Sequence, residues 1–573
     1  MAEDMQEEIL RHIQEDYDSL PYPAQNVEVA VEERMLPMPD GVRLKTYLFH
    51  EKQENLETGS RAFPVILQRS PYFHAMDVCR VHGMNLVRRG FLYVVQCCRG
   101  TGESEGIWEP NINERQDGLH TVRWLAAQDW TERIGYWGDS YLALTGWCMA
   151  DELPDKVKGM YLGVYGTDRF TSAYCKGLFR HDVLTAWAME NAGHPVTADY
   201  LESCRFRPHN RVDEALWGGA LPWYRDWIGS VKEEDPYWQE GFWDLLRKIP
   251  QKVNRPLLIR EGWYDHHLGS ALKSYEALNG DAAEHATLEI GSWNHGSMNC
   301  LEWDTPKNLK NSEVESMLSW FWQILVEGKM PERQIRIYVI GADRWLEPKE
   351  WPIPAKEYKV WYLSAQPKDG DVRIHRLSDR PAEPGGKVEY TYNPDDPVPS
   401  LGGEAMLKTM EHVGSLYQPE AGWRQDVVSF LSEPAVEEFT IAGKIRVHLL
   451  AASDCEDTAF SAKLMEVRED GKAVNIRSSI TTIAADLGDG VYRPGNAAEL
   501  TVEMWDIAWQ VKKGSRLRLD ISSSDFPQYA AHTNFPGAWS AQEKCRIARQ
   551  TIFCDREGSR LEIPVICMEE EKA

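Results

Sequence analysis

The feature that most constrains the fold is a short apolar segment that ends at a serine and is followed at once by a helical pattern. Residues 134–139 predict a strand, and residues 141 to about 153 predict a helix. Ser140 lies between them, where strand and helix approach closely and a small neighbour such as Gly138 is needed. A serine held on such a turn exposes its hydroxyl and is typical of the nucleophile elbow of an α/β-hydrolase.

A second serine fits the bare pattern G-x-S-x-G better. Gly102-Glu103-Ser104-Glu105-Gly106 matches it in full, whereas the motif around Ser140 ends in alanine. Ser104, however, follows a long connection after the apolar run 91–95, and Pro110 prevents a helix from starting soon after it. We therefore predict that Ser104 is a loop residue and that Ser140 is the nucleophile.

The other two members of a catalytic triad are expected downstream, each just past a strand and in the order acid, then histidine. Residues 256–260 predict a strand that leads into Asp265, and residues 287–290 predict the next strand, which leads into His295. Asp265 would orient the imidazole of His295 and stabilise its charged form. His295 would take the proton from Ser140 and later give it to the leaving group.

Motifs spread along the chain resemble those of one hydrolase family. The elbow is similar to Gly-x-Ser-Tyr-x-Gly, with Ala143 at the last position, and Gln68-Arg69-Ser70-Pro71-Tyr72 resembles an Arg-Thr-Pro-Tyr segment. Residues 94–106 resemble the family's Arg-Gly loop, and residues 424–430 and 516–527 resemble its C-terminal domain. The chain thus resembles the group of serine hydrolases that contains cocaine esterase, α-amino acid ester hydrolases and X-Pro dipeptidyl peptidases.

The resemblance implies two donors for the oxyanion of the tetrahedral intermediate. In the family, the tyrosine of the Arg-x-Pro-Tyr segment donates its hydroxyl, beside the backbone amide of the residue that follows the serine. Carried over to this chain, these groups are the hydroxyl of Tyr72 and the backbone amide of Tyr141. One such donor is typically worth about 3 kcal/mol of transition-state stabilisation.

The predicted elements divide the chain into four parts. Residues 1–24 predict an acidic helical extension that either packs on the enzyme or mediates assembly. Residues 25–164 and 254–328 predict the catalytic domain with a mostly parallel sheet, and residues 165–253 predict a helical cap over the active site. Residues 329–573 alternate with period two and predict an all-β sandwich. The fold class is therefore an α/β-hydrolase with a helical cap insertion and a C-terminal all-β domain, for which the resemblance implies a jelly-roll sandwich.

Composition excludes several classes of protein. The net charge of −26 over 573 residues argues against nucleic-acid binding, because phosphates would be repelled. The sequence contains no apolar stretch of about 18 residues, so no membrane span is predicted. The acidic N-terminus lacks the pattern of a secretory signal, and the 11 scattered cysteines are typical of a reduced cytosolic protein. We expect a cytoplasmic protein that needs no cofactor and that could form a homo-oligomer.

The cysteines and histidines show no spacing typical of a metal site, and the adjacent His266 and His267 are expected to point to different sides.

The predicted activity is hydrolysis of a small ester or amide through a Ser-His-Asp triad and an acyl-enzyme. Three classes of small-molecule or short-peptide substrate stay open: a small ester, an N-terminal dipeptide ending in proline, and an α-amino acyl ester or β-lactam amide. The last two need an acidic group that pairs with a free amine. The candidates in the cap are Asp168, Asp182 and Glu190.

Two alternatives concern residues and function class. The cap residues Tyr174, Phe179 and His181 either line the acyl pocket or only pack the cap. A non-catalytic ligand-binding protein is the competing class of function. The presence of Ser140 with both of its predicted partners argues against that class, because a degenerate homologue would be expected to have lost at least one of the three.

Overall fold

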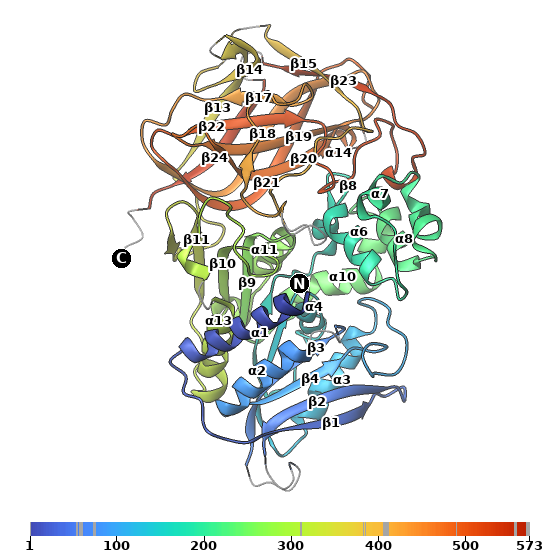
Figure 1. Cartoon of the computed structure of the whole chain (residues 1–573), viewed down its shortest axis with the longest axis vertical. Helices are drawn as coiled ribbons and strands as arrows, with labels where there is room; N and C mark the ends of the chain where they lie inside the picture. The colour runs from blue at the N-terminus through green and yellow to red at the C-terminus, as the bar shows by residue number, and fades with distance from the viewer. Residues whose placement is uncertain are drawn as a thin grey trace.

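The computed structural model describes residues 2–52, 56, 61–72, 76–309, 312–368, 370–381, 383, 385–404, 412–488, 490–554 and 558–568. In Figure 1 an α/β domain lies at the bottom, an all-β domain at the top, and a group of short helices at the right between them. This arrangement puts the helical group where it can cover the carboxyl ends of the catalytic strands.

The catalytic domain is built on one sheet, whose described strands follow the order β1-β2-β4-β3-β5-β6-β9-β10-β11-β12. From β4 to β11 neighbouring strands run parallel, and β1, β2 and β12 pair antiparallel at the two edges. The strands are β1 (Val29–Pro37), β2 (Arg43–Glu51), β3 (Phe63–Ser70), β4 (Leu92–Cys97), β5 (Thr131–Asp139), β6 (Val157–Gly163), β9 (Leu257–Tyr264), β10 (Thr287–Asn294), β11 (Gln334–Val339) and β12 (Arg344–Leu346). The central strands are buried on both faces, which explains why they are apolar runs and not alternating patterns.

Helices flank this sheet and connect its parallel strands. They are α1 (Ala2–Ser19), α2 (Met76–Arg88), α3 (Glu114–Ala126), α4 (Tyr141–Trp147), α11 (Leu268–Glu276), α12 (Gly280–Glu284) and α13 (Ser312–Phe321), which continues into η6 (Trp322–Val326). Within the described chain, no helix is long and apolar enough to cross a membrane.

The N-terminal extension packs on the catalytic domain. Helix α1 lies against α2 and α13 (Figure 1). Tyr17 is fully buried there, its hydroxyl lies 3.0 Å from Nδ1 of His82, and Arg89 Nη2 donates to its carbonyl oxygen at 2.7 Å. Of the two roles considered for the extension, the structure thus shows packing on the enzyme.

The structure places two strands beyond the boundary expected at residue 328, β11 and β12, in the catalytic sheet. We assigned residues 334–340 to the β-sandwich because they alternate, but β11 pairs parallel to β10 and extends the catalytic sheet. Helix α13 supplies the crossover between these two strands. Alternation alone does not tell which sheet a strand joins, so it could not separate an edge strand of this sheet from a sandwich strand.

The cap is the insertion between β6 and β9. It contains α5 (Arg169–Ala173), β7 (Tyr174–Cys175), β8 (Leu178–Phe179), α6 (His181–Glu190), α7 (Tyr200–Arg205), η2 (His209–Arg211), η3 (Asp213–Trp217), α8 (Pro222–Gly229), α9 (Pro236–Gln239), α10 (Gly241–Lys248) and η4 (Pro250–Lys252). Its elements are too short to be stable alone, and they are held together by buried rings of Trp217, Tyr224, Trp227, Trp238 and Trp243.

The C-terminal domain is all-β, as predicted. Its described strands follow the order β15-β23-β18-β24-β13-β14-β17-β22-β19-β20-β16, with β21 paired to β18. They are β13 (Glu357–Lys368), β14 (Asp371–Ser378), β15 (Lys387–Tyr392), β16 (Tyr417–Gln418), β17 (Val428–Leu431), β18 (Phe439–Ser453), β19 (Ala459–Val467), β20 (Ala473–Thr482), β21 (Ala498–Val511), β22 (Arg516–Ser522), β23 (Ala548–Phe553) and β24 (Arg560–Ile566), with α14 (Ile483–Leu487) and η8 (Trp539–Ala541) between them. The jelly-roll connectivity stays a prediction.

Candidate active site

Ser140 lies on a strained turn between strand and helix. It follows the last residue of β5, precedes the first residue of α4, and has φ 58° and ψ −126°. A non-glycine residue with positive φ is costly and persists only where its surroundings hold it. Strand and helix approach so closely that a Cβ on Gly138 would lie 2.2 Å from the carbonyl oxygen of Leu142. The turn therefore has the geometry of a nucleophile elbow.

His295 bridges the serine and a buried acid. Its Nε2 lies 2.8 Å from the Ser140 hydroxyl, and its Nδ1 lies 2.6 Å from Oδ2 of Asp265. The second carboxylate oxygen of Asp265 accepts the backbone N–H of His267 at 2.6 Å, and Asp265 is fully buried. With the imidazole hydrogen on Nδ1, the ring donates to the acid and accepts from the serine, which is the arrangement a general base needs.

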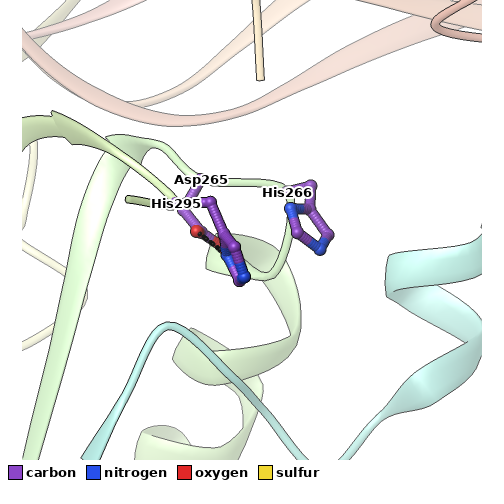
Figure 2. A group of neighbouring side chains, drawn as sticks. All are labelled: Asp265, His266 and His295. Carbon is purple, nitrogen blue, oxygen red and sulfur yellow. Dashed lines mark hydrogen bonds and ion pairs between the residues drawn. The ribbon is translucent and has the colours of Figure 1, made fainter. Parts of the chain in front are cut away.

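Figure 2 shows Asp265 and His295 in direct contact and His266 set to one side. Each of these three side chains has an atom that could ligate a metal, and the three atoms lie within 4.8 Å of one another. Both ring nitrogens of His295, however, are already hydrogen-bonded, Nδ1 to Asp265 and Nε2 to Ser140, and the second oxygen of Asp265 accepts from the backbone of His267. We therefore assign the pair to the serine and not to a metal.

The two residues predicted to bind the oxyanion line the cavity that contains Ser140. Tyr72 lines the same cavity as Ser140, and Trp187 Nε1 donates to its hydroxyl oxygen at 3.2 Å. Burial raises the pKa of Tyr72 to about 12, although that hydrogen bond opposes the shift, so the phenol keeps its proton at neutral pH. The backbone N–H of Tyr141 is the first of α4 and has no carbonyl one turn earlier to bond.

The phenol of Tyr141 has a structural role. Its hydroxyl donates to Glu114 Oε1 at 3.0 Å and accepts the backbone N–H of Asn111 at 2.8 Å. These bonds fix the start of α4 and therefore the direction of the Tyr141 amide.

The cap covers the cavity over Ser140. The described cap residues that line it are Tyr165, Arg169, Val183, Leu184, Trp187 and Trp227. Trp187 stacks parallel to the ring of Tyr141 at 6.2 Å between centroids, so the cap and the elbow are in contact. The described lining combines aromatic and apolar side chains with polar ones, among them Asn111 and three histidines, and it includes the cationic Arg169.

His266 and His267 were not predicted as site residues, and the expectation that they point to different sides is wrong. Their rings lie 4.1 Å apart, and both line the cavity. His267 Nδ1 lies 2.7 Å from the Ser172 hydroxyl. Burial, with the nearby positive charges, holds the pKa of both imidazoles well below the ordinary range, so both are neutral. The sequence signal that could have identified them as cavity residues is their position directly after Asp265.

None of the three acids considered for amine binding lines this cavity. Asp168 caps α5 and binds Lys273 Nζ at 2.6 Å. Asp182 is fully buried beside Arg180 at 3.4 Å, and Glu190 is exposed at the end of α6.

The cap residues Tyr174, Phe179 and His181 do not line the cavity either. Phe179 stacks on Trp539 of the all-β domain at 5.4 Å between centroids, and His181 lies edge-on to the same ring. They pack the cap against that domain.

Ser104 lies in a loop, as predicted. Its hydroxyl accepts the backbone N–H of Lys45 at 2.9 Å and donates to the carbonyl oxygen of Cys97 at 2.9 Å. Both bonds stabilise the loop, and Ser104 is not in the cavity.

Comparisons with known proteins agree with this architecture. Residues 40–297 match the family model described as X-Pro dipeptidyl-peptidase (S15 family), and residues 327–557 match the X-Pro dipeptidyl-peptidase C-terminal non-catalytic domain. The chain is 25% identical to a cocaine esterase from Rhodococcus sp. (strain MB1 Bresler), over 93% of this chain and 98% of that protein.

Solved structures show the same fold over nearly the whole chain. An aminopeptidase from a marine sediment archaeon, Thaumarchaeota archaeon, has a TM-score of 0.77 at 19% identity and covers 96% of this chain and 98% of its own. An α-amino acid ester hydrolase has a TM-score of 0.75 at 20% identity, with the same coverage of 96% and 98%. The chain therefore belongs to the serine hydrolase family that contains the cocaine esterases, the α-amino acid ester hydrolases and the X-Pro dipeptidyl peptidases.

Proposed function

We propose that Ser140 attacks the carbonyl carbon of an ester or amide and forms an acyl-enzyme that water then hydrolyses. The observation that supports this most is the unbroken pair of hydrogen bonds from Asp265 through His295 to Ser140. A serine hydroxyl is a weak nucleophile unless an adjacent base removes its proton, and His295 Nε2 lies at the distance this requires.

The proposed steps follow from this geometry. His295 takes the proton of Ser140 as its oxygen attacks, and Asp265 stabilises the imidazolium that forms. The imidazolium then gives this proton to the leaving alcohol or amine. In the second half, His295 takes a proton from water, whose oxygen attacks the acyl carbon, and the proton returns to Ser140 as the acid leaves.

The oxyanion of each tetrahedral intermediate is proposed to bind the Tyr72 hydroxyl and the Tyr141 amide. The raised pKa of Tyr72 supports this role, because a phenol that stays protonated can donate. The aromatic side chains of the lining would limit the access of water and so strengthen both hydrogen bonds.

The test is hydrolysis of a small panel by the wild-type protein, Ser140→Ala and Tyr72→Phe. The panel holds p-nitrophenyl acetate and butyrate, phenylglycine methyl ester, and Gly-Pro- and Ala-Pro-p-nitroanilide. We expect Ser140→Ala to reduce kcat by about 10⁴-fold or more and Tyr72→Phe by about 10²- to 10³-fold. Wild-type turnover by Ser140→Ala on every substrate that the intact protein cleaves would refute the proposal.

A further inference from the structure

The cavity over Ser140 contains a buried arginine whose charge is not balanced. Arg169 begins α5 in the cap and is only 9% exposed. Among the described residues, no carboxylate lies within the 4.0 Å of an ion pair from its guanidinium, and its buried Nε has no hydrogen-bond partner. The guanidinium carbon lies 4.8 Å from the ring centroid of Trp227, which also lines the cavity.

The groups around Arg169 are neutral. They are the phenols of Tyr72 and Tyr165, whose pKa values burial raises, and the imidazoles of His266 and His267, whose pKa values burial lowers. The positive charge of Arg169 opposes the rise in both phenols and adds to the fall in both imidazoles. No negative charge is therefore supplied from this side of the cavity by the described residues.

Two acids, one that precedes Arg169 in the sequence and one in the active site, already have other partners. Asp168 precedes Arg169, but its carboxylate binds Lys273 Nζ at 2.6 Å and the Thr171 hydroxyl at 2.8 Å. Asp265 is bound to His295 and to the backbone N–H of His267. Neither forms an ion pair with Arg169.

An unpaired charge removed from water costs several kcal/mol, so proteins pair buried charges or use them. We propose that Arg169 binds a carboxylate of the substrate, and that the substrates are esters or amides that carry this anionic group beside the scissile bond. The inference rests on the proposed function, because it takes the cavity over Ser140 as the place of reaction. A guanidinium suits a carboxylate, since its planar fork matches the two oxygens.

The same charge disfavours two of the substrate classes that the sequence left open. An α-amino acyl ester and an N-terminal dipeptide both bring an ammonium, which the cationic side chain would repel. Among the described residues that line the cavity, none supplies a carboxylate to hold that ammonium. Hydrolysis of an anionic ester needs only water as second reactant, and it yields the free acid and the alcohol.

The experiment compares anionic substrates with neutral ones of matched shape. One pair, monoethyl adipate and ethyl hexanoate, places the carboxylate on the acyl portion. The other pair, 4-acetoxybenzoate and 4-methylphenyl acetate, places it on the leaving group. We expect one pair to show a kcat/KM ratio, anionic over neutral, of about 10 to 100, which corresponds to a hydrogen-bonded charge pair. The pair that shows it identifies the side of the scissile bond that Arg169 faces.

Two variants test the residue. In Arg169→Gln this ratio is expected to fall to about 1, since a glutamine carries no charge to hold the carboxylate. Arg211→Gln is the matched control, because Arg211 is an exposed arginine of the cap outside the cavity lining and its removal changes the net charge equally. If the ratio falls equally in both variants, the preference comes from the overall charge of the cap and not from Arg169, and the inference is overturned.

Binding provides a readout that does not need turnover. Ser140→Ala should unfold at a higher temperature when adipate is added, and Ser140→Ala/Arg169→Gln should not. If esters are cleaved in a Ser140-dependent way but neither pair favours its anionic member, the inference fails while the proposed function stands. If nothing is cleaved but adipate binds through Arg169, the site is anionic and the proposed function fails.

Discussion

The buried arginines at the junction of the domains and the buried arginine in the cavity differ in how their charges are balanced. Arg180 of the cap lies 3.8 Å from Glu404 of the all-β domain and 3.4 Å from Asp182. Arg477 of β20 lies 3.7 Å from the same Glu404 and donates to the carbonyl oxygen of Trp263 in β9 at 2.6 Å. This junction joins the cap, the catalytic domain and the all-β domain. Arg169, in the cavity, forms no such ion pair with a described residue.

The difference separates a structural charge from one kept for a ligand. At the junction, Glu404 faces two cations from different parts of the chain, and the domains must be docked for these ion pairs to exist. In the cavity, the described residues give the buried cation no counter-ion, and an unpaired buried charge destabilises the free enzyme. Such a cost is typical of groups whose partner is the substrate. The contrast predicts opposite effects on stability when the two regions are altered.

The largest effect is expected for Glu404→Ala. It leaves Arg180 and Arg477 without their shared acid, and breaking a buried pair in this way costs about 3–5 kcal/mol. Thermal unfolding should begin at a clearly lower temperature. Glu437→Ala, which removes an exposed acid of the same domain, is the control. Equal unfolding temperatures for the two variants would show that Glu404 does not hold the junction together.

The next effect depends on pH and concerns Asp182. Burial, aided by the charge of Glu404 and opposed by Arg180, raises the pKa of Asp182 from 3.8 to about 7. The folded state therefore binds more protons than the unfolded state between these values, so this group's contribution to stability is present below about pH 4 and lost as the pH rises through 7. The difference between the two pKa values sets an upper limit of about 4 kcal/mol.

Asp182→Asn cannot ionise, so its unfolding temperature should rise relative to the wild type as the pH increases from 4 to 8. The measurement is the difference between the two unfolding temperatures at each pH, which removes the contribution of all other carboxyl groups. A difference that stays constant across this range would show that Asp182 is ionised throughout in the folded protein.

The sequence predicted that Ser140, Asp265 and His295 would lie together, because each follows a strand in a fixed order and those buried strands are visible as apolar runs. It predicted the helical extension and the all-β domain for similar reasons. It did not predict Arg169, His266 or His267 as cavity residues. Short cap helices carry little periodicity, and one sequence does not show which of their faces meets the catalytic domain. For the same reason, the sequence could not show that Asp168 and Asp182 lie outside the cavity. Both are instead paired with cationic side chains inside the protein.

The smallest effect is expected for Arg169→Met, and its sign distinguishes the two regions. Methionine is flexible and of similar length, so it can fill the space beside Trp227 while removing an unbalanced buried charge. The unfolding temperature should stay equal to that of the wild type or rise, by the equivalent of about 1 kcal/mol. Adipate at about ten times its dissociation constant should stabilise the wild-type protein by a similar free energy and so raise its unfolding temperature. It should leave the unfolding temperature of the variant unchanged. A marked loss of stability in Arg169→Met would instead mean that another group of the protein balances the charge of Arg169, as Glu404 does for Arg180. The inference that the substrate carries a carboxylate would then be wrong.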